Sequence, residues 1–174
     1  MIEVFDEFLT PEEITELFKT LRESSWILEE KVPYLSEVQL EGGADIGYIK
    51  EIPENTIYWK ILGRLHSLPI ISGKYKFFSA FRNAYKRGDV TALHTDESDI
   101  TALLYGNPKW NINWGSETIF TESLSPDTEI IASIIPKPGR LVIFDSSIPH
   151  SGRPPSSSFA NHRYSVAYNF KKII

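Results

Sequence analysis

The spacing of hydrophobic residues changes along this chain, from a helical period near the N-terminus to an alternating period in the second half. Four hydrophobic residues fall on one face at helical spacing: Ile14, Leu17, Phe18 and Leu21. Thr10 is a suitable N-cap, Pro11 suits the first helical position, and Glu13 completes a capping box with Thr10. These signals predict a helix over residues 11–24 that packs on the outside of a sheet.

A second helix is predicted over residues 55–66. Its hydrophobic set is Ile57, Ile61, Leu62 and Leu65. Residues 27–52 contain glycines, a proline and mixed polarity, which indicates strands and irregular loops. From Tyr75 onward the period approaches two, and short runs are separated by turn residues. The strands predicted from this pattern cover residues 76–85, 90–94, 100–105, 117–120, 129–135, 140–144 and 163–170.

Many short strands after a helical opening predict a mainly β fold of the α+β kind. We expect a double-stranded β-helix, or jelly roll, of about eight strands, with the N-terminal helices packed on one sheet. No internal repeat or convincing boundary divides the chain, so residues 1–174 are expected to form a single domain. The serine-rich stretch 154–158 is expected to be a mobile loop.

Composition narrows the functional classes. The 174 residues include no cysteine, so neither disulfides nor thiolate ligands are available, which fits an intracellular, cytoplasmic protein. The net charge is −5, which argues against nucleic acid as a partner. No run approaches 18 apolar residues and no secretory signal is visible, so no membrane association is expected.

Two histidines and one carboxylate are spaced as a shared metal site would require. His94 and Asp96 are two positions apart, and alternation along a strand would point both side chains the same way. His150 comes much later and would join them from another strand. Two histidines with one carboxylate form the ligand set that holds a non-haem ferrous ion with open coordination positions. Arg163 follows, and its planar fork suits a carboxylate.

The residues around these positions carry a family resemblance. The matching stretches are NAYKRGD (83–89), LYGNPKW (104–110), WGSET (114–118), PGRLVIFD (138–145) and the segment from His150 to Arg163, with weaker support from VFDEFLTPEE (4–13). The chain resembles the 2-oxoglutarate and Fe(II)-dependent oxygenase superfamily, in its prolyl-4-hydroxylase-like branch. It departs from that pattern at Ser116, where a second glycine is usual.

The resemblance implies an enzyme that uses Fe(II), 2-oxoglutarate as co-substrate, and O2. His94, Asp96 and His150 would be the catalytic metal ligands, Arg163 would pair with the far carboxylate of 2-oxoglutarate, and Tyr105 and Tyr85 would help to bind it. The implied reaction is hydroxylation, with succinate and CO2 as co-products. Related halogenases lack the carboxylate ligand that Asp96 would supply.

Several residues have more ordinary interpretations. His66 and His162 are assigned to packing or to the surface, and Trp110 and Trp114 to packing or turns. Arg140 is expected to keep its charge in solvent. If Arg163 faced outward, Lys171 or Arg153 would have to bind the carboxylate, and Arg153 lies close enough after His150 to face the mouth of a pocket.

Other functions remain as alternatives. A cupin-type metal protein would show His-x-His with a later glutamate, which is absent around His94. The branch that repairs nucleobases carries a second arginine six positions after the first, where this chain has Asn169. The third alternative is a non-catalytic jelly-roll metal-binding or interaction domain. The substrate is expected to be a small molecule or a peptide, with a prolyl residue favoured by the resemblance, but neither 27–52 nor 151–161 carries a signature for it or for an oligomeric state.

Overall fold

The computed structural model describes residues 1–24, 45–89 and 92–174, and strands dominate these ranges. In chain order the strands are β1 (Ile2–Phe5), β2 (Asp45–Ile49), β3 (Tyr75–Tyr85), β4 (Ile100–Tyr105), β5 (Thr118–Thr121), β6 (Ile130–Ile134), β7 (Leu141–Asp145), β8 (His150–Gly152) and β9 (Arg163–Lys172). All pair in antiparallel fashion, in a large sheet of order β1-β7-β4-β9-β3-β2 and a small sheet of order β6-β5-β8. The predicted mainly β jelly roll is confirmed.

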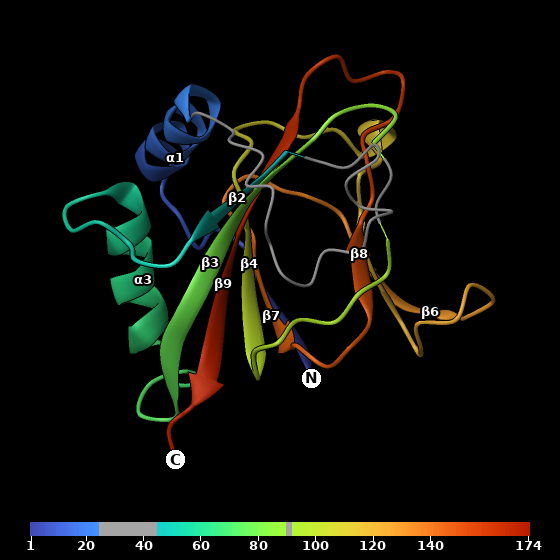
Figure 1. The fold of residues 1–174 in the computed structure, drawn as a ribbon. Helices are drawn as coiled ribbons and strands as arrows, with labels where there is room; N and C mark the ends of the chain where they lie inside the picture. The colour runs from blue at the N-terminus through green and yellow to red at the C-terminus, as the bar shows by residue number, and fades with distance from the viewer. Residues whose placement is uncertain (25–44, 90–91) are drawn as a thin grey trace.

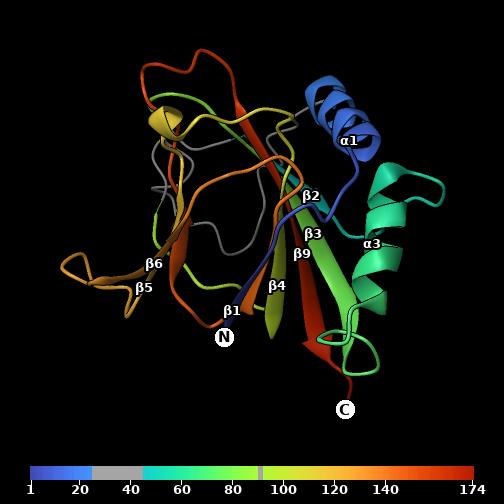
Figure 2. The ribbon, with the colours of Figure 1, turned by 180° about the vertical axis from the view of Figure 1, so that it is seen from behind.

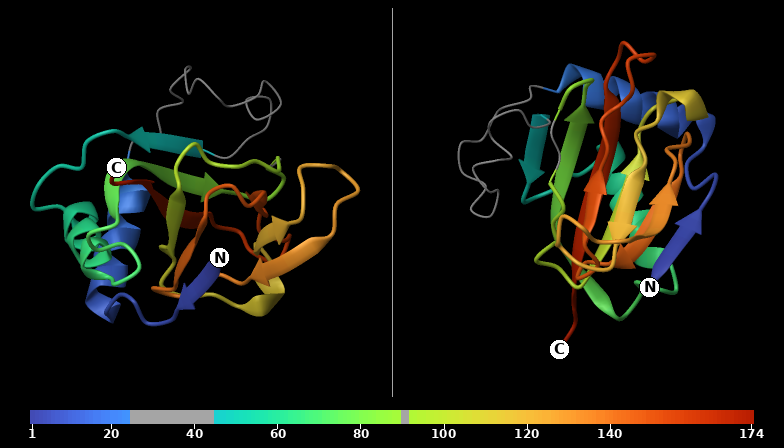
Figure 3. Two further views of the ribbon diagram at one scale, coloured as in Figure 1. Left: turned by 90° about the horizontal axis from the view of Figure 1, so that it is seen from below. Right: turned by 90° about the vertical axis from the view of Figure 1, so that its right-hand side faces the viewer.

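The molecule is layered, with helices on one side of the large sheet and the small sheet on the other (Figures 1 and 2). The view from below in Figure 3 shows the same order of layers. The N-terminal strand β1 and the C-terminal strand β9 both belong to the large sheet.

The helices are α1 (Pro11–Glu23) and α3 (Ile57–Ser67), each within two residues of its predicted bounds. The capping box of α1 forms as predicted, because Glu13 N donates to Thr10 Oγ1 at 3.3 Å and Thr10 N donates to Glu13 Oε2 at 2.9 Å. The Glu13 carboxylate also accepts from Arg64 Nη1 at 2.9 Å, which joins α1 to α3. No helix within 1–24, 45–89 and 92–174 is both long and apolar enough to cross a membrane.

Two separate cores lie on the two faces of the large sheet. The outer core joins the sheet to the helices and includes Leu17, Leu21, Ile61, Leu65, Ala102, Leu104, Ile143, Val166 and Phe170. The inner core lies between the sheets and consists of Leu103, Tyr105, Phe120, Val142 and Phe144. Neighbouring positions of β4 and β7 therefore enter different cores, as alternation along a strand requires.

The inner face of the large sheet is much more polar than its outer face. Strand β9 lies between β3 and β4, and its outer positions Tyr164, Val166, Tyr168 and Phe170 belong to the outer core. On its other face, Arg163, Ser165 and Asn169 are all buried, at 1%, 0% and 4% exposure. The fold therefore places polar side chains in an interior where each needs a partner.

Two predictions about strands were wrong. Residues 92 and 93 are not in a strand and His94 forms only an isolated bridge with His150, while residues 90–91 lie outside the described residues. Strand alternation is therefore not what brings His94 and Asp96 together. Arg163 was also expected on a strand beside the one leading to His150, but β9 is bordered by β3 and β4.

The loop predictions had mixed outcomes. The serine-rich stretch 154–158 was expected to be mobile, yet Ser156 N donates to Trp114 O at 2.8 Å, and the Ser158 hydroxyl donates to Asn113 O at 3.1 Å. These bonds attach it to the short 3-10 helix η1 (Ile112–Trp114). Most of the unassigned 27–52 region lies outside the described residues, and its described end contains β2.

Candidate metal and co-substrate site

The structure brings His94, Asp96 and His150 together, with ligand-capable atoms all within 4.8 Å of one another. His94 Nε2 lies 3.8 Å from Asp96 Oδ1, and His150 Nε2 lies 3.7 Å from Asp96 Oδ2. Among the residues that the structure describes, this is the one cluster of three or more histidine, cysteine, aspartate or glutamate side chains that is close enough to hold a metal ion.

Backbone hydrogen bonds, rather than strand alternation, align these three residues. His94 N donates to His150 O at 3.0 Å and His150 N donates to His94 O at 2.9 Å, so the two residues sit directly opposite each other. Asp96 N donates to Ser146 O at 3.0 Å, which holds the Asp96 segment against the end of β7. The loop that carries His94 and Asp96 is thus fixed to both sheets.

Both imidazole rings are oriented by a carbonyl on the side away from Asp96. His94 Nδ1 lies 3.1 Å from Ala92 O, and His150 Nδ1 lies 2.9 Å from Ile148 O. A carbonyl can only accept, so Nδ1 carries the proton and the lone pair is on Nε2. Each histidine therefore points its unprotonated Nε2, the atom that can bind a metal, toward the Asp96 carboxylate.

The cluster is open on one side. The His150 side chain is 8% exposed and packs against Phe144 and Phe120, with ring centroids 4.7 and 6.0 Å away, whereas the His94 side chain is 40% exposed. Burial lowers the pKa of His150, which favours the neutral form that ligates metals. Two neutral imidazoles and one carboxylate fit Fe(II) and leave coordination positions free.

Arg163 lies in the same interior, between two tyrosine rings. In the register of the large sheet Arg163 is opposite Tyr85 of β3, and Ser165 is opposite Tyr105 of β4. The Arg163 Cζ atom is 5.0 Å from the centroid of the Tyr85 ring and 5.1 Å from that of Tyr105. Burial raises the pKa of both tyrosines, so their hydroxyls keep their protons and remain donors.

The buried Arg163 guanidinium is only partly satisfied. Nη1 donates to Ser165 Oγ at 3.1 Å and Nη2 to Thr118 Oγ1 at 2.8 Å, while Nε has no hydrogen-bond partner in the part of the chain that the structure describes. No aspartate or glutamate of the described residues forms an ion pair with it. A buried charge without a counter-ion is costly, so this arrangement suits a carboxylate ligand.

Thr118 is a site residue that the sequence reasoning missed. Its Oγ1 accepts from both Tyr105 Oη and Arg163 Nη2, each at 2.8 Å, and Tyr105 Oη also lies 3.3 Å from Ile134 O. Thr118 begins β5, so it reaches Arg163 from the opposite sheet. The available signal was its place in the WGSET stretch that carries the family resemblance, but nothing in the sequence relates β5 to β9.

Strand β8 connects the metal-ligand cluster to the arginine. A Cβ atom added at Gly152 would lie 3.2 Å from Tyr85 Cε2 and 3.3 Å from Arg163 Nη1. His150 and Gly152 are two residues apart in one strand, a spacing of about 6.6 Å. The ligand cluster therefore lies at one end of β8 and the guanidinium at the other. The distance between these two ends is comparable to the length of a five-carbon dicarboxylate.

The other cations named from the sequence lie elsewhere. Arg153 is exposed, and Lys171 Nζ lies over the ring of Phe78, 4.0 Å from its centroid. Trp110 and Trp114 pack against each other with ring centroids 5.5 Å apart, and both contact Phe159, as the packing interpretation predicted. Ser116 has a φ of 71°, which explains why a glycine is usual there.

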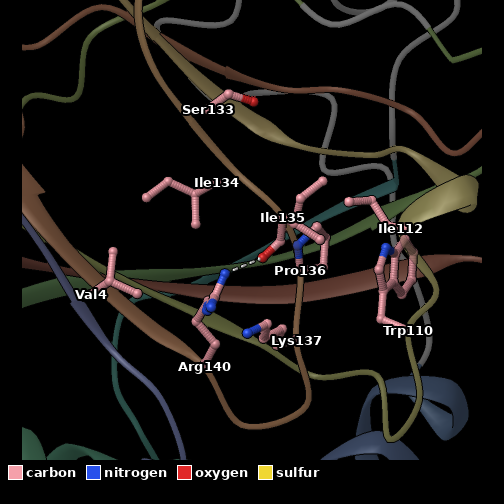
Figure 4. A pocket seen from close by; sticks show the side chains of 9 residues that line it. All are labelled: Val4, Trp110, Ile112, Ser133, Ile134, Ile135, Pro136, Lys137 and Arg140. Atoms are coloured by element: carbon pink, nitrogen blue, oxygen red, sulfur yellow. Dashed lines mark hydrogen bonds between the residues drawn. The ribbon is translucent and has the colours of Figure 1, made fainter.

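A groove of about 440 Å³ lies apart from this site, between β1 and β6 (Figure 4). It is lined by Val4, Trp110, Ile112, Ser133, Ile134, Ile135, Pro136, Lys137 and Arg140. Arg140 was expected in solvent, but its Nη1 donates to Ile135 O at 2.9 Å and its Nε to Asp6 Oδ1 at 2.6 Å. The charge is thus paired, and none of the metal-ligand candidates lines the groove.

Comparison with known proteins gives one family match and many structural matches. The sequence model described as the 2OG-Fe(II) oxygenase superfamily matches residues 80–171, more than half of the chain, and this range contains every site residue described above. A comparison with curated protein sequences finds no match.

The structural matches share the fold at low sequence identity. A Pseudomonas putida prolyl-4-hydroxylase is 19% identical with a TM-score of 0.71, covering 99% of this chain and 93% of its own. A Trichoplax adhaerens prolyl hydroxylase, solved with a hypoxia-inducible-factor peptide, is 17% identical with a TM-score of 0.67, covering 98% and 83%. The non-haem α-ketoglutarate-dependent epimerase SnoN from nogalamycin biosynthesis is 16% identical with a TM-score of 0.66, covering 98% and 78%.

Proposed function

This chain belongs to the 2-oxoglutarate and Fe(II)-dependent oxygenase superfamily, and we propose that it hydroxylates a substrate C–H bond in one catalytic domain spanning residues 1–174. The enzyme uses Fe(II), 2-oxoglutarate and O2. The observation that carries the proposal is a His94–Asp96–His150 cluster in one interior with the buried Arg163, which forms no ion pair with a carboxylate of the described residues.

His94, Asp96 and His150 would hold the iron. The two Nε2 atoms and the Asp96 carboxylate supply three ligands, and the bound iron would supply the oxidative chemistry in which 2-oxoglutarate is converted to succinate and CO2. The exposed side of the cluster, at His94, is where a substrate would approach. Packing of His150 against Phe144 and Phe120 keeps water from the opposite side.

Arg163 would bind the carboxylate of 2-oxoglutarate that lies away from the metal. Its Nε has no hydrogen-bond partner among the described residues, and the Tyr85 and Tyr105 rings lie 5.0 and 5.1 Å from its Cζ atom, so the Nε edge is where a carboxylate would add a hydrogen bond. The Thr118 hydroxyl accepts two hydrogen bonds already, and its own proton is available to the same carboxylate. Two polar contacts at a planar edge would select a carboxylate over a neutral group.

We propose a prolyl residue in a peptide as the substrate, with a small molecule as the alternative. The support is the likeness to the two prolyl hydroxylases, one of which was solved with a peptide. The fold alone does not select the substrate, since SnoN shares it. Asp96 supports hydroxylation, because it occupies the ligand position that halogenation would need vacant.

The proposal is tested in two stages. Purified protein is first incubated with Fe(II) and 2-oxoglutarate, and succinate is measured with and without the metal. Metal-dependent succinate supports the oxygenase, whereas a protein that forms no succinate, whether or not it binds Fe(II), would be the non-catalytic metal-binding or interaction domain. Proline-containing peptides and matched peptides with alanine are then compared by mass spectrometry, with the gain of one oxygen on the proline peptide alone as the expected result. Oxidation of both peptides, or of neither while a metabolite pool is oxidised, would reject the prolyl substrate.

A further inference from the structure

A row of buried polar side chains runs across the inner face of the large sheet, beside the metal-ligand cluster. Thr101 of β4 is opposite Asn169 of β9, which in turn is opposite Ser79 of β3. The three residues are 1%, 4% and 1% exposed. Asn169 Nδ2 donates to Ser79 Oγ at 3.4 Å, and Thr101 Oγ1 lies 3.2 Å from Asn169 Oδ1. This row ends at Asp96.

The contact between Thr101 and Asp96 is the shortest in the row. Thr101 Oγ1 donates to Asp96 Oδ2 at 2.5 Å. A hydroxyl has one proton, and a carboxylate is a stronger acceptor than a neutral amide or hydroxyl oxygen, so the proton of Thr101 belongs to Asp96. The side chain of Thr101 thereby faces one particular oxygen of the candidate ligand.

The direction of the Thr101 proton decides how two neighbouring serine hydroxyls are oriented. Ser146 Oγ lies 2.9 Å from Thr101 Oγ1 and 2.7 Å from Ser98 Oγ. Because the Thr101 proton goes to Asp96, the Ser146 hydroxyl must donate to Thr101. The Ser98 proton then goes to Ser146 at 2.7 Å rather than to Ile100 O, which lies farther away at 3.3 Å. The chain of donors Ser98, Ser146, Thr101 then ends on a negative charge, an arrangement in which each bond polarises the next.

We propose that Thr101 is a positioning residue that fixes which oxygen of Asp96 reaches the metal. This inference rests on the proposed function. Each Asp96 oxygen lies near one histidine, Oδ1 at 3.8 Å from His94 Nε2 and Oδ2 at 3.7 Å from His150 Nε2. Oδ2 accepts the Thr101 hydrogen bond, whereas Oδ1 accepts none from the described residues, so Oδ1 is the oxygen that keeps its lone pairs for the metal. A carboxylate held in this way acts as a one-oxygen ligand, because rotation to offer both oxygens would break the Thr101 bond. Coordination positions then stay open for 2-oxoglutarate and O2.

Substitution at Thr101 separates hydrogen bonding from packing. Thr101→Val keeps the shape of the side chain and removes the donor, while Thr101→Ser keeps the donor. Loss of such an outer hydrogen bond to a metal ligand weakens metal affinity by roughly 10- to 100-fold. We therefore expect Thr101→Val to bind metal 10- to 100-fold more weakly and Thr101→Ser to match the wild type.

Thr121→Val is the matched control. Thr121 is 2% exposed, lies in β5, and donates to Ser123 O at 2.8 Å, so its substitution also deletes one buried threonine hydrogen bond. Its hydroxyl also lies 3.5 Å from Pro149 O, but among the described residues no hydrogen bond joins its side chain to a metal-ligand candidate. A similar decrease in the unfolding temperature of Thr101→Val and Thr121→Val, measured without metal, would show that the two variants lose hydrogen bonds of comparable importance for stability.

The experiment titrates metal-free protein with Co(II) and, without oxygen, with Fe(II), and measures the dissociation constant and the Co(II) absorption spectrum. Weaker binding and a changed spectrum in Thr101→Val, with Thr101→Ser and Thr121→Val unchanged, supports the inference. Metal binding by the wild type with an equal constant for Thr101→Val overturns this inference alone. A wild type that binds no metal overturns the proposed function and this inference together.

Ser146→Ala provides a second test that does not depend on the folding of Thr101→Val. It removes the hydroxyl that donates to Thr101 and leaves both Thr101 and Asp96 in place. We expect weaker metal binding in the same direction but of smaller size, because Thr101 still carries its proton but is less firmly oriented. An unchanged dissociation constant in Ser146→Ala would contradict the chain of donors.

Discussion

The two faces of strand β9 share one backbone but differ in the polarity and charge of their side chains. The outer face places Val166, Tyr168 and Phe170 against the helices, with no charged group among them. The inner face places Arg163, Ser165 and Asn169 between the sheets, all of them buried. Alternation along one strand therefore places the core-packing residues on one face and the candidate ligand-binding residues on the other.

The difference extends to the charge of the buried polar groups. On the outer face the Tyr168 hydroxyl donates to Tyr58 O at 3.3 Å. On the inner face Arg163 Nε is buried and has no hydrogen-bond partner among the described residues. An incompletely paired interior charge lowers stability, and a ligand that completes the pairing recovers that free energy as binding energy. The inner face therefore suits an anionic ligand, whereas the buried residues of the described outer core carry no charge.

The largest effect on the inner face is expected from His150→Ala. Removing one of two imidazole ligands leaves two candidate donors, so we expect loss of both stoichiometric metal and succinate formation. Metal content by elemental analysis and turnover by succinate release check this. His150 also packs against Phe144 and Phe120 of the inner core, so thermal unfolding of the variant is measured to check that it is folded. A variant with full metal content and wild-type turnover would remove His150 from the site.

Phe170→Ala tests the outer face in the opposite way. Phe170 is fully buried and its ring lies 6.2 Å from Phe77 and 5.6 Å from His66, measured between centroids. Its truncation should lower the free energy of unfolding by about 3–5 kcal/mol. The 2-oxoglutarate dissociation constant of the remaining folded protein should stay unchanged. Denaturant unfolding and ligand titration measure the two quantities, and a large change in ligand affinity would show that the faces are coupled.

Arg163→Ala should weaken 2-oxoglutarate binding by about 2–5 kcal/mol, the scale for truncating one member of a buried charge pair. Iron affinity should change little, since Arg163 is not among the ligand candidates. Arg163→Met, which keeps much of the volume without the charge, should leave the ligand-free protein as stable as the wild type or more so. Calorimetric titration and denaturant unfolding provide both measurements. An unchanged 2-oxoglutarate constant in Arg163→Ala would exclude Arg163 as the anchor.

The predictions from the sequence were most accurate for features that short-range patterns determine. The alternating runs gave β3, β4 and β9 within two residues, and Thr10 and Glu13 gave the start of α1. The three-residue strand β8 was not predicted, because a run so short has no period to detect. Residue type and spacing identified the candidate ligands His94, Asp96 and His150, whose side chains the structure places together, although strand alternation is not the reason.

What the sequence did not contain is the pairing between distant segments. His94 and Asp96 lie beside His150 because the His94 backbone pairs with the His150 backbone, and that bridge joins a loop to the start of β8 by contacts that no local pattern specifies. Thr118 and Thr101 look like ordinary strand threonines, and only the apposition of the two sheets and the register of β4 against β9 show their partners. Register and sheet stacking are tertiary properties, which explains why the first set of ligands was predictable and the residues that support them were not.

The smallest expected effect concerns pH and the outer face. His66, in the last turn of α3, packs edge-on against Phe170, and burial lowers its pKa. The folded state therefore binds the proton less readily than the unfolded state, whose histidine titrates near about 6.5. The stabilising contribution of neutral His66 is present above that pH and is lost as the pH falls below it. His66→Gln should remove this part of the pH dependence, so the difference in unfolding free energy between the two proteins should change between pH of about 7.5 and 5.5. Denaturant unfolding of both metal-free proteins across that range measures it, and His150 and other groups common to both cancel in the difference. The effect should be small because the His66 side chain is still partly exposed to water. A difference in unfolding free energy that stays constant with pH would show that packing against the apolar outer face does not disfavour protonation of His66.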